Sequence, residues 1–414
     1  MENNAELSFD LYITANSPGE IAGWVAPLVR ELRPRLWNAR ITLVIVPCQY
    51  ASGAELAMGA EVGVDRTVRI GGVGEMLRAD AASGVRLRRN ARKMVLHLGG
   101  DFFFSTYLSK RLHCPLWAYS SRPRWGRFVE RFFVPDEKAE RRFAILDFSR
   151  DRYERVGHLA LDSVLLAESE EETRSVLGLA SDEPVLAFLT GSRPIEYLVG
   201  IPYFARIAAL IARKFGDHRI FFPLAPTVDE DRLCAALASA GVEWKGESRV
   251  HAIHIGDGKW ANVVRGRTLE VLNCAKLAVA VPGTNNLQAA ALFTPFIMVL
   301  PLDRADEYPL DGLPGVLPLW IPGMRYLKKK YIQKLNEKVE FISLPNRMAG
   351  RMIAPEIRGI FREEDVAKCA VELLENPTRL QEMSRAFWEL THERGAALKF
   401  AEKIAQWAKN GGKR

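Results

Sequence analysis

The feature that most constrains the fold of this chain is a continuous alternation of short apolar runs with helical patterns. Runs typical of strands cover 7–13, 41–46, 94–98 and 132–134, and a second series covers 185–190, 219–224, 252–255, 277–281 and 296–299. Strands separated by helices predict parallel βαβ units. We therefore expect an α/β protein with two doubly wound domains that face each other across a cleft.

Two of these runs end in turns of small residues, and a helical pattern follows each turn. Run 185–190 continues into Gly191, Ser192 and Arg193, and run 277–281 continues into Pro282, Gly283, Thr284, Asn285 and Asn286. A helix after such a turn offers free N–H groups and the positive end of its dipole to a phosphate. Arg193 adds a permanent forked charge. The pair predicts a cradle for a nucleotide diphosphate, although either turn alone could be an ordinary strand-to-helix connection.

Polar residues also follow two runs of the N-terminal half. Ser17, Gly19 and Glu20 follow the first run, where they could approach a ligand or cap a helix. Capping is the favoured interpretation for Glu20, and both roles stay open for Ser17. Asp101 follows run 94–98 after two glycines. It could act as a general base on a hydroxyl or cap a helix over 102–112, and the residues alone do not separate these roles.

Length and composition narrow the class of protein. The 414 residues favour two or three domains, with expected bounds of 1–165, 166–361 and a helical tail from 362 to 414. No apolar run reaches the ~18–20 residues that a spanning helix needs. The five scattered cysteines predict reduced thiols and a cytoplasmic protein. No residue cluster has metal-ligand spacing, so we expect neither a metal nor another cofactor.

The basic character of the chain points to acidic partners. The formal net charge is +7, but no nucleic-acid-binding motif accompanies it, so nucleic acid is not expected as a partner. Aromatic residues crowd 102–108, and basic residues crowd 85–93, 121–131 and 326–331. Each segment alone predicts a buried helix or a solvated face. Together they predict peripheral contact with an anionic membrane surface.

Several of these motifs resemble those of the lipid-A-disaccharide synthase family. The similar segments, in family order, are Val156-Gly157-His158, Gly191-Ser192-Arg193, Pro282-Gly283-Thr284, 294–299, Leu344-Pro345-Asn346, Ala349-Gly350-Arg351 and Pro355-Glu356. The resemblance covers nearly the whole chain. It implies a GT-B architecture, in which two Rossmann-like domains enclose an interdomain cleft and C-terminal helices cross back to the first domain.

The resemblance also implies an activity and roles for particular residues. The family joins two acylated glucosamine units at the inner membrane, using a UDP-activated donor, with inversion and without a bound metal. The correspondence places Arg193 at the donor phosphates, Gly283 and Thr284 in the nucleotide loop and Asn346 on the nucleotide side. It places Asp101 where the family has an aspartate suited to act as the base, which favours catalysis over capping.

The chain also departs from the family pattern. Gln288 is the nearest equivalent of a family glutamate suited to ribose hydroxyls, and Pro282 replaces a serine. An amide can bind a ribose hydroxyl but cannot accept from both hydroxyls with full charge. Asp101 is followed by two phenylalanines where the family has Phe-Asn. With these differences, a diverged member that uses another sugar or another lipid acceptor fits at least as well as lipid A synthesis itself.

The sequence thus predicts an inverting hexosyltransferase that moves a sugar from a UDP-sugar to a lipid-linked or acylated sugar acceptor at the cytoplasmic membrane face. Asp101 is the expected catalytic residue, and Ser17, Gly19 and Glu20 are expected on the acceptor side. The expected nucleotide-sugar-binding residues are Gly191, Ser192, Arg193, Gly283, Thr284, Asn285, Asn286, Gln288 and Asn346. Two alternatives remain: a UDP-sugar 2-epimerase-like enzyme on the same fold, and an inactive relative that binds nucleotide sugars.

Overall fold

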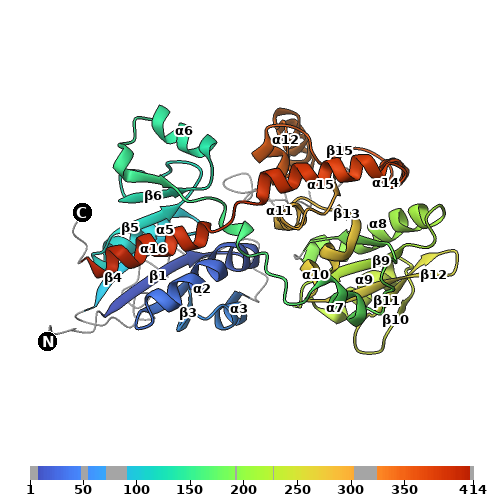
Figure 1. Ribbon diagram of the computed structural model, residues 1–414, viewed down its shortest axis with the longest axis horizontal. Coiled ribbons are helices and arrows are strands. Elements are labelled where there is room, and N and C mark those ends of the chain that lie inside the picture. The colour runs from blue at the N-terminus through green and yellow to red at the C-terminus, as the bar shows by residue number, and fades with distance from the viewer. Residues whose placement is uncertain are drawn as a thin grey trace. The chain divides into compact units, whose positions relative to one another are not determined.

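The computed structural model describes residues 8–47, 55–70, 91–191, 194–226, 228–302 and 324–410. The chain forms two compact units (Figure 1). Unit 1 comprises Met1–Ser163 with Arg394–Arg414, and unit 2 comprises Val164–Glu393. Unit 1 contains a sheet of seven strands and unit 2 a sheet of eight. Each unit therefore has its own sheet and its own buried core.

The sheet of unit 1 is entirely parallel, in the order β3-β2-β1-β4-β5-β6-β7. Its strands are β1 (Phe9–Ala15), β2 (Arg40–Ile45), β3 (Arg66–Arg69), β4 (Arg92–His97), β5 (Leu116–Tyr119), β6 (Arg131–Val134) and β7 (Tyr153–Arg155). Every residue of β1 is buried. A strand that is buried along its whole length is typical of a parallel sheet that is covered on both faces.

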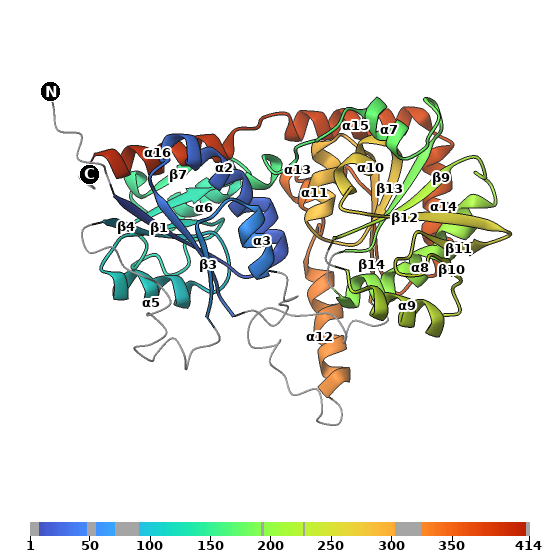
Figure 2. The ribbon, with the colours of Figure 1, turned by 90° about the horizontal axis from the view of Figure 1, so that it is seen from below.

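Helices cover both faces of this sheet. They are α1 (Pro18–Glu20), a π-helical segment (Ile21–Val25), α2 (Ala26–Arg35), α3 (Glu55–Glu61), α5 (Phe102–Leu112), α6 (Glu137–Ile145), two single 3-10 turns (Arg150–Arg152, Leu159–Leu161) and α16 (Ala396–Lys409). Figure 2 shows α2 and α16 on one face and α5 on the other. Because successive strand residues point to opposite faces, Leu11 and Ile13 pack with Phe400 of α16, whereas Tyr12 packs with Phe104 of α5.

The sheet of unit 2 has the order β10-β11-β12-β9-β8-β13-β14-β15. Its strands are β8 (Val185–Leu189), β9 (Arg219–Leu224), β10 (Trp244–Lys245), β11 (Ala252–Gly256), β12 (Lys259–Arg265), β13 (Ala275–Ala280), β14 (Phe296–Pro301) and β15 (Glu356–Gly359). The six strands from β12 to β15 are parallel, and β11 and β10 extend the sheet with antiparallel pairings.

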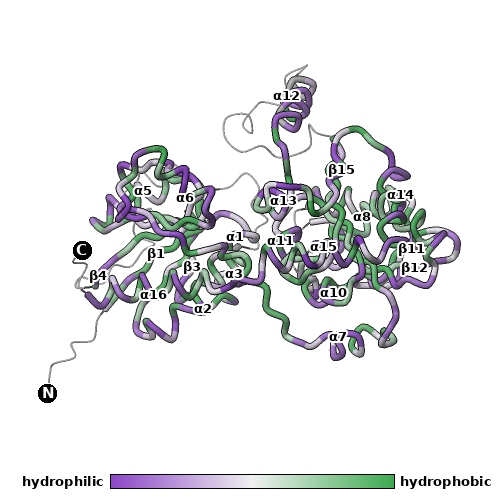
Figure 3. Tube along the Cα trace, turned by 45° about the horizontal axis from the view of Figure 1, so that its top comes forward, coloured by the Kyte–Doolittle hydropathy of each residue, from purple (hydrophilic) through white to green (hydrophobic). Residues whose placement is uncertain are grey.

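The helices of unit 2 contribute mainly to one core with this sheet. They are α7 (Glu170–Val176), α8 (Pro194–Ala212), α9 (Glu230–Ser239), α10 (Thr268–Cys274), α11 (Thr284–Ala291), α12 (Met324–Lys338), α13 (Leu344–Ala349), α14 (Glu363–Leu374) and α15 (Pro377–Thr391). Helix α15 reaches the core through Phe387, whose ring stacks on Phe296 of β14 at 5.3 Å between centroids. In Figures 2 and 3, α12 projects from the rest of unit 2, and Figure 3 colours many of its residues as hydrophilic.

The chain returns to unit 1 at a well-defined cap. The carboxylate of Asp162 accepts hydrogen bonds from the backbone N–H groups of Gly395, at 2.7 Å, and Ala397, at 2.6 Å. This carboxylate satisfies the free donors at the start of α16. The cap therefore ties the start of the last helix to the segment that leads out of unit 1 after Ser163.

Two doubly wound sheets and a helical C-terminal segment confirm the predicted fold class. Both sheets share one plan, because β3-β2-β1-β4 of unit 1 and β12-β9-β8-β13 of unit 2 have the same order relative to the chain. The strand order reverses beside the first strand of each unit, between β1 and β4 in unit 1 and between β8 and β13 in unit 2. In a doubly wound sheet, ligands bind outside the carboxyl ends of the strands at this reversal.

Candidate functional site

The turns singled out in the sequence lie at these two reversals. In unit 1, β1 and β4 are neighbours, and their connections lead to α1 and α5. In unit 2, β8 and β13 are neighbours, and their connections lead to α8 and α11. The strand order therefore brings the Ser17–Glu20 segment beside the Asp101 turn, and the Gly191 turn beside the Gly283 turn.

The first turn of unit 2 needs a glycine. Gly191 has a φ of 95°, in the left-handed region, and a Cβ atom there would lie 2.2 Å from Oε2 of Glu196. Glu196, in the first turn of α8, thus covers the backbone of Gly191, a contact that the sequence analysis missed. An acidic residue in the first turn of a helix was the available signal. Ser192 and Arg193 lie outside the described residues.

The second turn of unit 2 leaves a helix end without a side-chain cap. The N-cap residue of α11 is Gly283. A Cβ atom added to this glycine would meet no other atom within 4 Å. Thr284 is exposed, and Asn285 and Gln288 are half-buried. An uncapped helix N-terminus with an open approach suits an anion.

The side chain of Asn286 holds this turn through a hydrogen bond to the backbone. It is fully buried, and its Nδ2 atom donates to the backbone oxygen of Val281 at 3.1 Å. The N–H of Val281 in turn donates to the backbone oxygen of Leu189 at 3.1 Å, which joins the turn to β8. The Oδ1 atom of Asn286 is buried without a partner among the described residues. The side chain therefore orients the turn and keeps one acceptor unused.

Asn346 has a different environment from the one expected for a ligand-binding side chain. It is fully buried at the start of α13, and its Nδ2 atom donates to Ala354 O at 2.8 Å and to Glu356 Oε1 at 2.9 Å. Its Oδ1 atom accepts from the N–H groups of Ile353 and Ala354 at 2.8 and 3.0 Å. An amide has two donors and two acceptor sites, so none is left for a ligand. The geometry thus gives Asn346 a role in shaping the loop.

In unit 1, Glu20 links the two connections at the strand-order reversal. Its Oε2 atom accepts from the backbone N–H of Asn16 at 2.8 Å, and a Cβ atom on Gly99 would lie 2.0 Å from the same oxygen. Ser17 is the N-cap of α1 and accepts from the N–H of Glu20 at 3.4 Å, while Gly19 lies within α1. Ser17 and Glu20 therefore both cap the start of α1, which was the favoured interpretation for Glu20.

Asp101 follows β4, the strand next to β1, and lies at the start of α5. It is exposed, and its Oδ1 atom accepts from the N–H of Phe103 at 2.8 Å, as an N-cap should. Its Oδ2 atom has no hydrogen-bond partner among the described residues. Capping uses one oxygen and leaves the other toward solvent, so the two roles considered for Asp101 are compatible.

A buried polar cluster lies behind Asp101. Nδ1 of His97 is 2.7 Å from Oγ of Ser105, which is 2.9 Å from Oγ1 of Thr14. The imidazole also stacks on the ring of Phe102 at 3.7 Å between centroids. Burial lowers the pKa of His97 to about 3, so the ring is neutral. The cluster joins β1, β4 and α5 and fixes the turn that carries Asp101.

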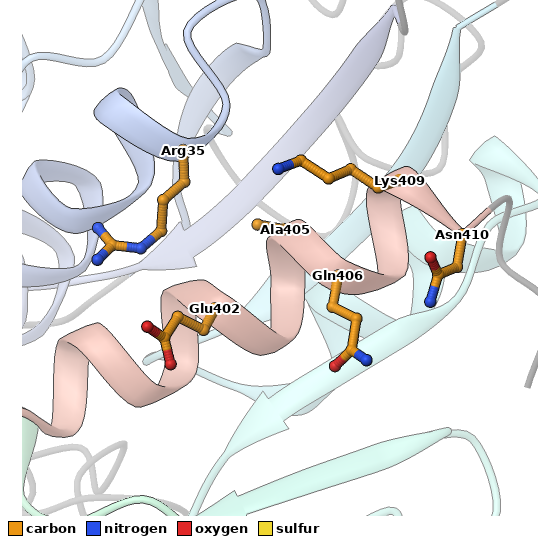
Figure 4. A pocket seen from close by; sticks show the side chains of 6 residues that line it. All are labelled: Arg35, Glu402, Ala405, Gln406, Lys409 and Asn410. Carbon is orange, nitrogen blue, oxygen red and sulfur yellow. The ribbon is translucent and has the colours of Figure 1, made fainter.

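Two surface hollows of unit 1 lie away from this edge of the sheet. One of about 330 Å³ is lined by Arg35 of α2 and by Glu402, Gln406 and Lys409 of α16 (Figure 4). Another, of about 600 Å³, lies between the end of α5 and Glu130. Both adjoin the amino ends of the strands, opposite the edge that carries Asp101. Strand order and side-chain chemistry, rather than surface shape, therefore mark the candidate site.

The described residues contain neither a candidate metal site nor a helix that could span a membrane. No group of three or more His, Cys, Asp or Glu side chains is placed to hold a metal ion. No helix in the described part of the chain has the length and hydrophobicity needed to span a bilayer. The cysteines that the structure describes, Cys114, Cys234, Cys274 and Cys369, are unpaired.

The structural relatives of the chain share its fold. It is similar to the UDP-GlcNAc 2-epimerase from Neisseria meningitidis bound to UDP-GlcNAc, with a TM-score of 0.58 at 11% identity over 96% of this chain and 100% of that one. It is similar to the Methanocaldococcus jannaschii UDP-GlcNAc 2-epimerase in complex with UDP-GlcNAc and UDP, with a TM-score of 0.56 at 15% identity over the same shares. These likenesses show the GT-B fold.

The sequence relatives all point to one family. A family model described as lipid-A-disaccharide synthetase matches residues 140–304. Lipid-A-disaccharide synthase of Syntrophus aciditrophicus is 27% identical over 294 residues, which is 69% of this chain and, at 66%, just under two thirds of that relative. The Myxococcus xanthus enzyme is 25% identical over 73% of this chain and 72% of its own length, and that of Salmonella paratyphi B is 23% identical over 91% and 92%. At these identities the matches support a diverged member of the lipid-A-disaccharide synthase family.

Proposed function

We propose that this chain is an inverting glycosyltransferase that transfers a sugar from a UDP-sugar to a hydroxyl of a lipid-linked or acylated sugar acceptor. The observation that carries the proposal is the chemistry of the two strand-order reversals. One presents a carboxylate oxygen, on Asp101, that has no partner among the residues the structure describes, and the other presents the uncapped helix N-terminus at Gly283. The relatives named lipid-A-disaccharide synthase support the reaction class.

The turns of unit 2 would hold the donor. The positive end of α11 and the charge of Arg193 would stabilise the diphosphate as negative charge develops on it. Thr284, Asn285 and Gln288 lie on the accessible part of this turn, where they would bind the nucleotide and its ribose. Asn286, Asn346 and Gly191 would set the shape of the site, because each is occupied by contacts within the protein.

Asp101 would supply the base. Its free oxygen takes the proton of the acceptor hydroxyl as that oxygen attacks the anomeric carbon. The bond from this carbon to the diphosphate breaks, its electron pair leaves with UDP, and the configuration at the carbon inverts. Glu20, Ser17 and Gly19 shape the edge beside Asp101 on the acceptor side. We infer that the reaction takes place at the cytoplasmic face of a membrane, where an acylated acceptor resides.

Nucleotide binding gives the first test. Calorimetric titration of the wild type with UDP, GDP and CMP should show selective binding of UDP, and Arg193→Ala should lose it. Arg213→Ala removes an arginine whose side chain is 65% exposed and paired with Asp257, and it should bind UDP as the wild type does. The absence of binding to any nucleotide would contradict the donor site.

Turnover then separates the glycosyltransferase from the alternatives. UDP release from a UDP-sugar that requires an acylated sugar acceptor supports the proposal. Conversion of the donor without an acceptor would instead indicate an epimerase. UDP binding with no product and no effect of Asp101→Asn would indicate an inactive relative.

A further inference from the structure

We propose that Thr14, His97 and Ser105 position the carboxylate of Asp101 for its reaction with the acceptor, with His97 as the central positioning residue. These three residues form the buried cluster behind Asp101, here called the polar cluster. The polar cluster acts through Asp101 rather than on the substrate. The proposal rests on the proposed function, in which Asp101 is the base, and it adds what holds that base in place.

The hydrogen bond between His97 and Ser105 closes the turn that carries Asp101. His97 is the last residue of β4, and Ser105 lies near the start of α5. Nδ1 of His97 lies 2.7 Å from Oγ of Ser105. Asp101 is the central residue of the segment between these two partners. The two ends of the turn are thus tied together, with the proposed base at its midpoint.

The residues that connect β4 to Asp101 have no side chains that could fix the carboxylate. They are Gly99 and Gly100, and Gly100 has a φ of 80°, in the left-handed region that glycine adopts easily. A Cβ atom on Gly100 would lie 2.2 Å from Cγ2 of Val46, so the turn packs closely against the end of β2. This packing limits the turn on one side. The polar cluster limits it on the side of α5.

The ring of His97 makes a second contact across the turn. It stacks on the ring of Phe102, the residue after Asp101, with 3.7 Å between centroids and 25° between the planes. Phe102 is buried, so this contact lies within the core. The stack and the hydrogen bond to Ser105 hold α5 at two points that follow Asp101. Two such points fix the rotation of the first helical turn as well as its distance from the sheet.

The polar cluster is anchored to two strands of the sheet. Thr14 and His97 are register partners in the parallel pair of β1 and β4. Oγ of Ser105 lies 2.9 Å from Oγ1 of Thr14, so Ser105 bonds to both strands. Thr14 and Ser105 are fully buried, and His97 is 4% exposed. Hydrogen bonds in such surroundings are stronger than in water, because little water competes for them.

Apolar packing already holds α5 on the sheet, which favours a positioning role over a purely stabilising one. Phe104, Leu108 and Leu112 belong to the core on this face. Apolar contacts have no direction, whereas hydrogen bonds do. A base must lie about 2.6–3.2 Å from the oxygen whose proton it takes, and a misplacement of ~1 Å costs about a hundredfold in rate. The polar cluster supplies directional bonds at the end of α5 that carries Asp101.

Two serines of α5 give a matched test. Ser105→Ala removes the hydroxyl of the polar cluster, and Ser109→Ala removes a hydroxyl near the other end of the helix, where it donates to the backbone oxygen of Cys114 at 2.6 Å. We expect Ser105→Ala to lower kcat for sugar transfer by about 10- to 100-fold, with unchanged UDP affinity and an unchanged KM for the donor. Ser109→Ala should keep kcat within about twofold of the wild type. Equal kcat values for the two variants would overturn the proposal.

Variants of His97 separate positioning from packing and from direct catalysis. His97→Leu removes the hydrogen bond to Ser105 and should lower kcat by about a hundredfold, whereas His97→Gln keeps a bonding group and should stay within about fivefold of the wild type. A merely structural role would lower the melting temperature of both variants without this difference in kcat. The acidic limb of the kcat profile should remain in His97→Gln, because the base is Asp101. Loss of that limb would make His97 the base and overturn its positioning role.

Hydrogen exchange reports on the position of Asp101 without any turnover. The N–H of Phe103 donates to Oδ1 of Asp101 at 2.8 Å, so its exchange rate shows whether the carboxylate is in place. This amide should exchange about tenfold faster in Ser105→Ala than in the wild type and should be unchanged in Ser109→Ala. Unchanged exchange in Ser105→Ala and His97→Leu would overturn the proposal, whatever their kcat. Faster exchange in both, in a protein that transfers no sugar, would keep the hold of the polar cluster on Asp101 and contradict only the proposed function.

Discussion

Helices α5 and α11 occupy the same place in their respective sheets, yet their N-termini differ. Helix α5 follows β4, which pairs with the first strand of unit 1, and α11 follows β13, which pairs with the first strand of unit 2. In unit 1 the end of α5 is capped by the carboxylate of Asp101, whereas in unit 2 the end of α11 has only Gly283 as its N-cap. A carboxylate at a helix N-terminus already satisfies its donors and dipole, and an uncapped end does not. One plan therefore gives a capped helix end in unit 1, where we propose a base, and an uncapped helix end in unit 2, where we propose an anion site.

The first helix of each sheet shows a similar contrast. Ser17 and Glu20 make polar contacts at the start of α1, and Glu20 reaches across to Gly99 of the neighbouring connection. In unit 2, the carboxylate of Glu196 covers Gly191 instead. The topology decides where a ligand can bind, and a few residues at the strand ends decide which ligand that is.

Asp101→Asn should have the largest effect on this comparison. Asparagine caps a helix as well as aspartate does, so α5 keeps its cap while the base is lost. We expect kcat for sugar transfer to fall by about 10²- to 10⁴-fold, with an unchanged melting temperature and unchanged UDP affinity. Asp136→Asn makes the same change at the N-cap of α6 and should retain activity. A similar loss in both variants would attribute the effect to the charge of this edge rather than to a base.

Gly283→Asp would give α11 an aspartate cap like the one that Asp101 gives α5. The backbone of Gly283 is extended, with a φ of 165°, and a side chain there meets open space, so the change should leave folding intact. Its carboxylate would lie where we place the diphosphate, and a unit charge ~6 Å away costs about 3 kcal/mol at an effective dielectric constant of ~20. We expect UDP affinity to fall on the order of a hundredfold.

The neutral variant Gly283→Asn is the control for shape. It should lose less than tenfold in UDP affinity by the same calorimetric titration, because it caps the helix without adding charge. Equal affinities for the aspartate and asparagine variants would show that the nucleotide phosphates do not lie at this helix end.

Gly191→Ala should affect stability rather than charge. The φ of 95° and the contact with Glu196 both exclude a Cβ atom, so we expect a loss of about 2 kcal/mol in the free energy of unfolding. Gly283→Ala, at an open and extended position, should be within about 0.5 kcal/mol of the wild type. Urea unfolding of the two variants measures the difference. Equal stabilities would mean that the Gly191 turn has another conformation in solution.

Many of the helices and turns compared above could be predicted from local sequence. The helix expected over 102–112 matches α5 (Phe102–Leu112), because an aspartate cap and an apolar pattern mark it clearly. Both small-residue turns were recognised from the runs that precede them. The strand β12 (Lys259–Arg265) was missed, since half-buried positions at Asn262 and Val264 interrupt its apolar pattern.

The pairings that create the site could not be predicted in this way. The contact between Glu20 and Gly99 depends on β1 lying beside β4, residues that are distant in the chain. Asn346 was expected near the nucleotide, but its four hydrogen bonds follow from the conformation of 353–356 around it. Sequence also could not decide between the roles of Asp101, because the answer depends on which carboxylate oxygen the cap uses.

A smaller, pH-dependent effect should distinguish the two units. His97 lies next to the strand-order reversal of unit 1, and burial lowers its pKa to about 3, from about 6.5 in an unfolded chain. Between these values the unfolded state binds a proton that the folded state does not, so stability falls as the pH falls below about 6.5. The slope is up to about 1.4 kcal/mol per pH unit. His97→Gln can still bond to Ser105 without titrating, so its urea-unfolding free energy should fall less between pH 6.5 and pH 5. Burial also lowers the pKa of His158, which would leave a residual slope in the variant. Parallel curves for the wild type and His97→Gln would show that the cluster behind Asp101 is open to water.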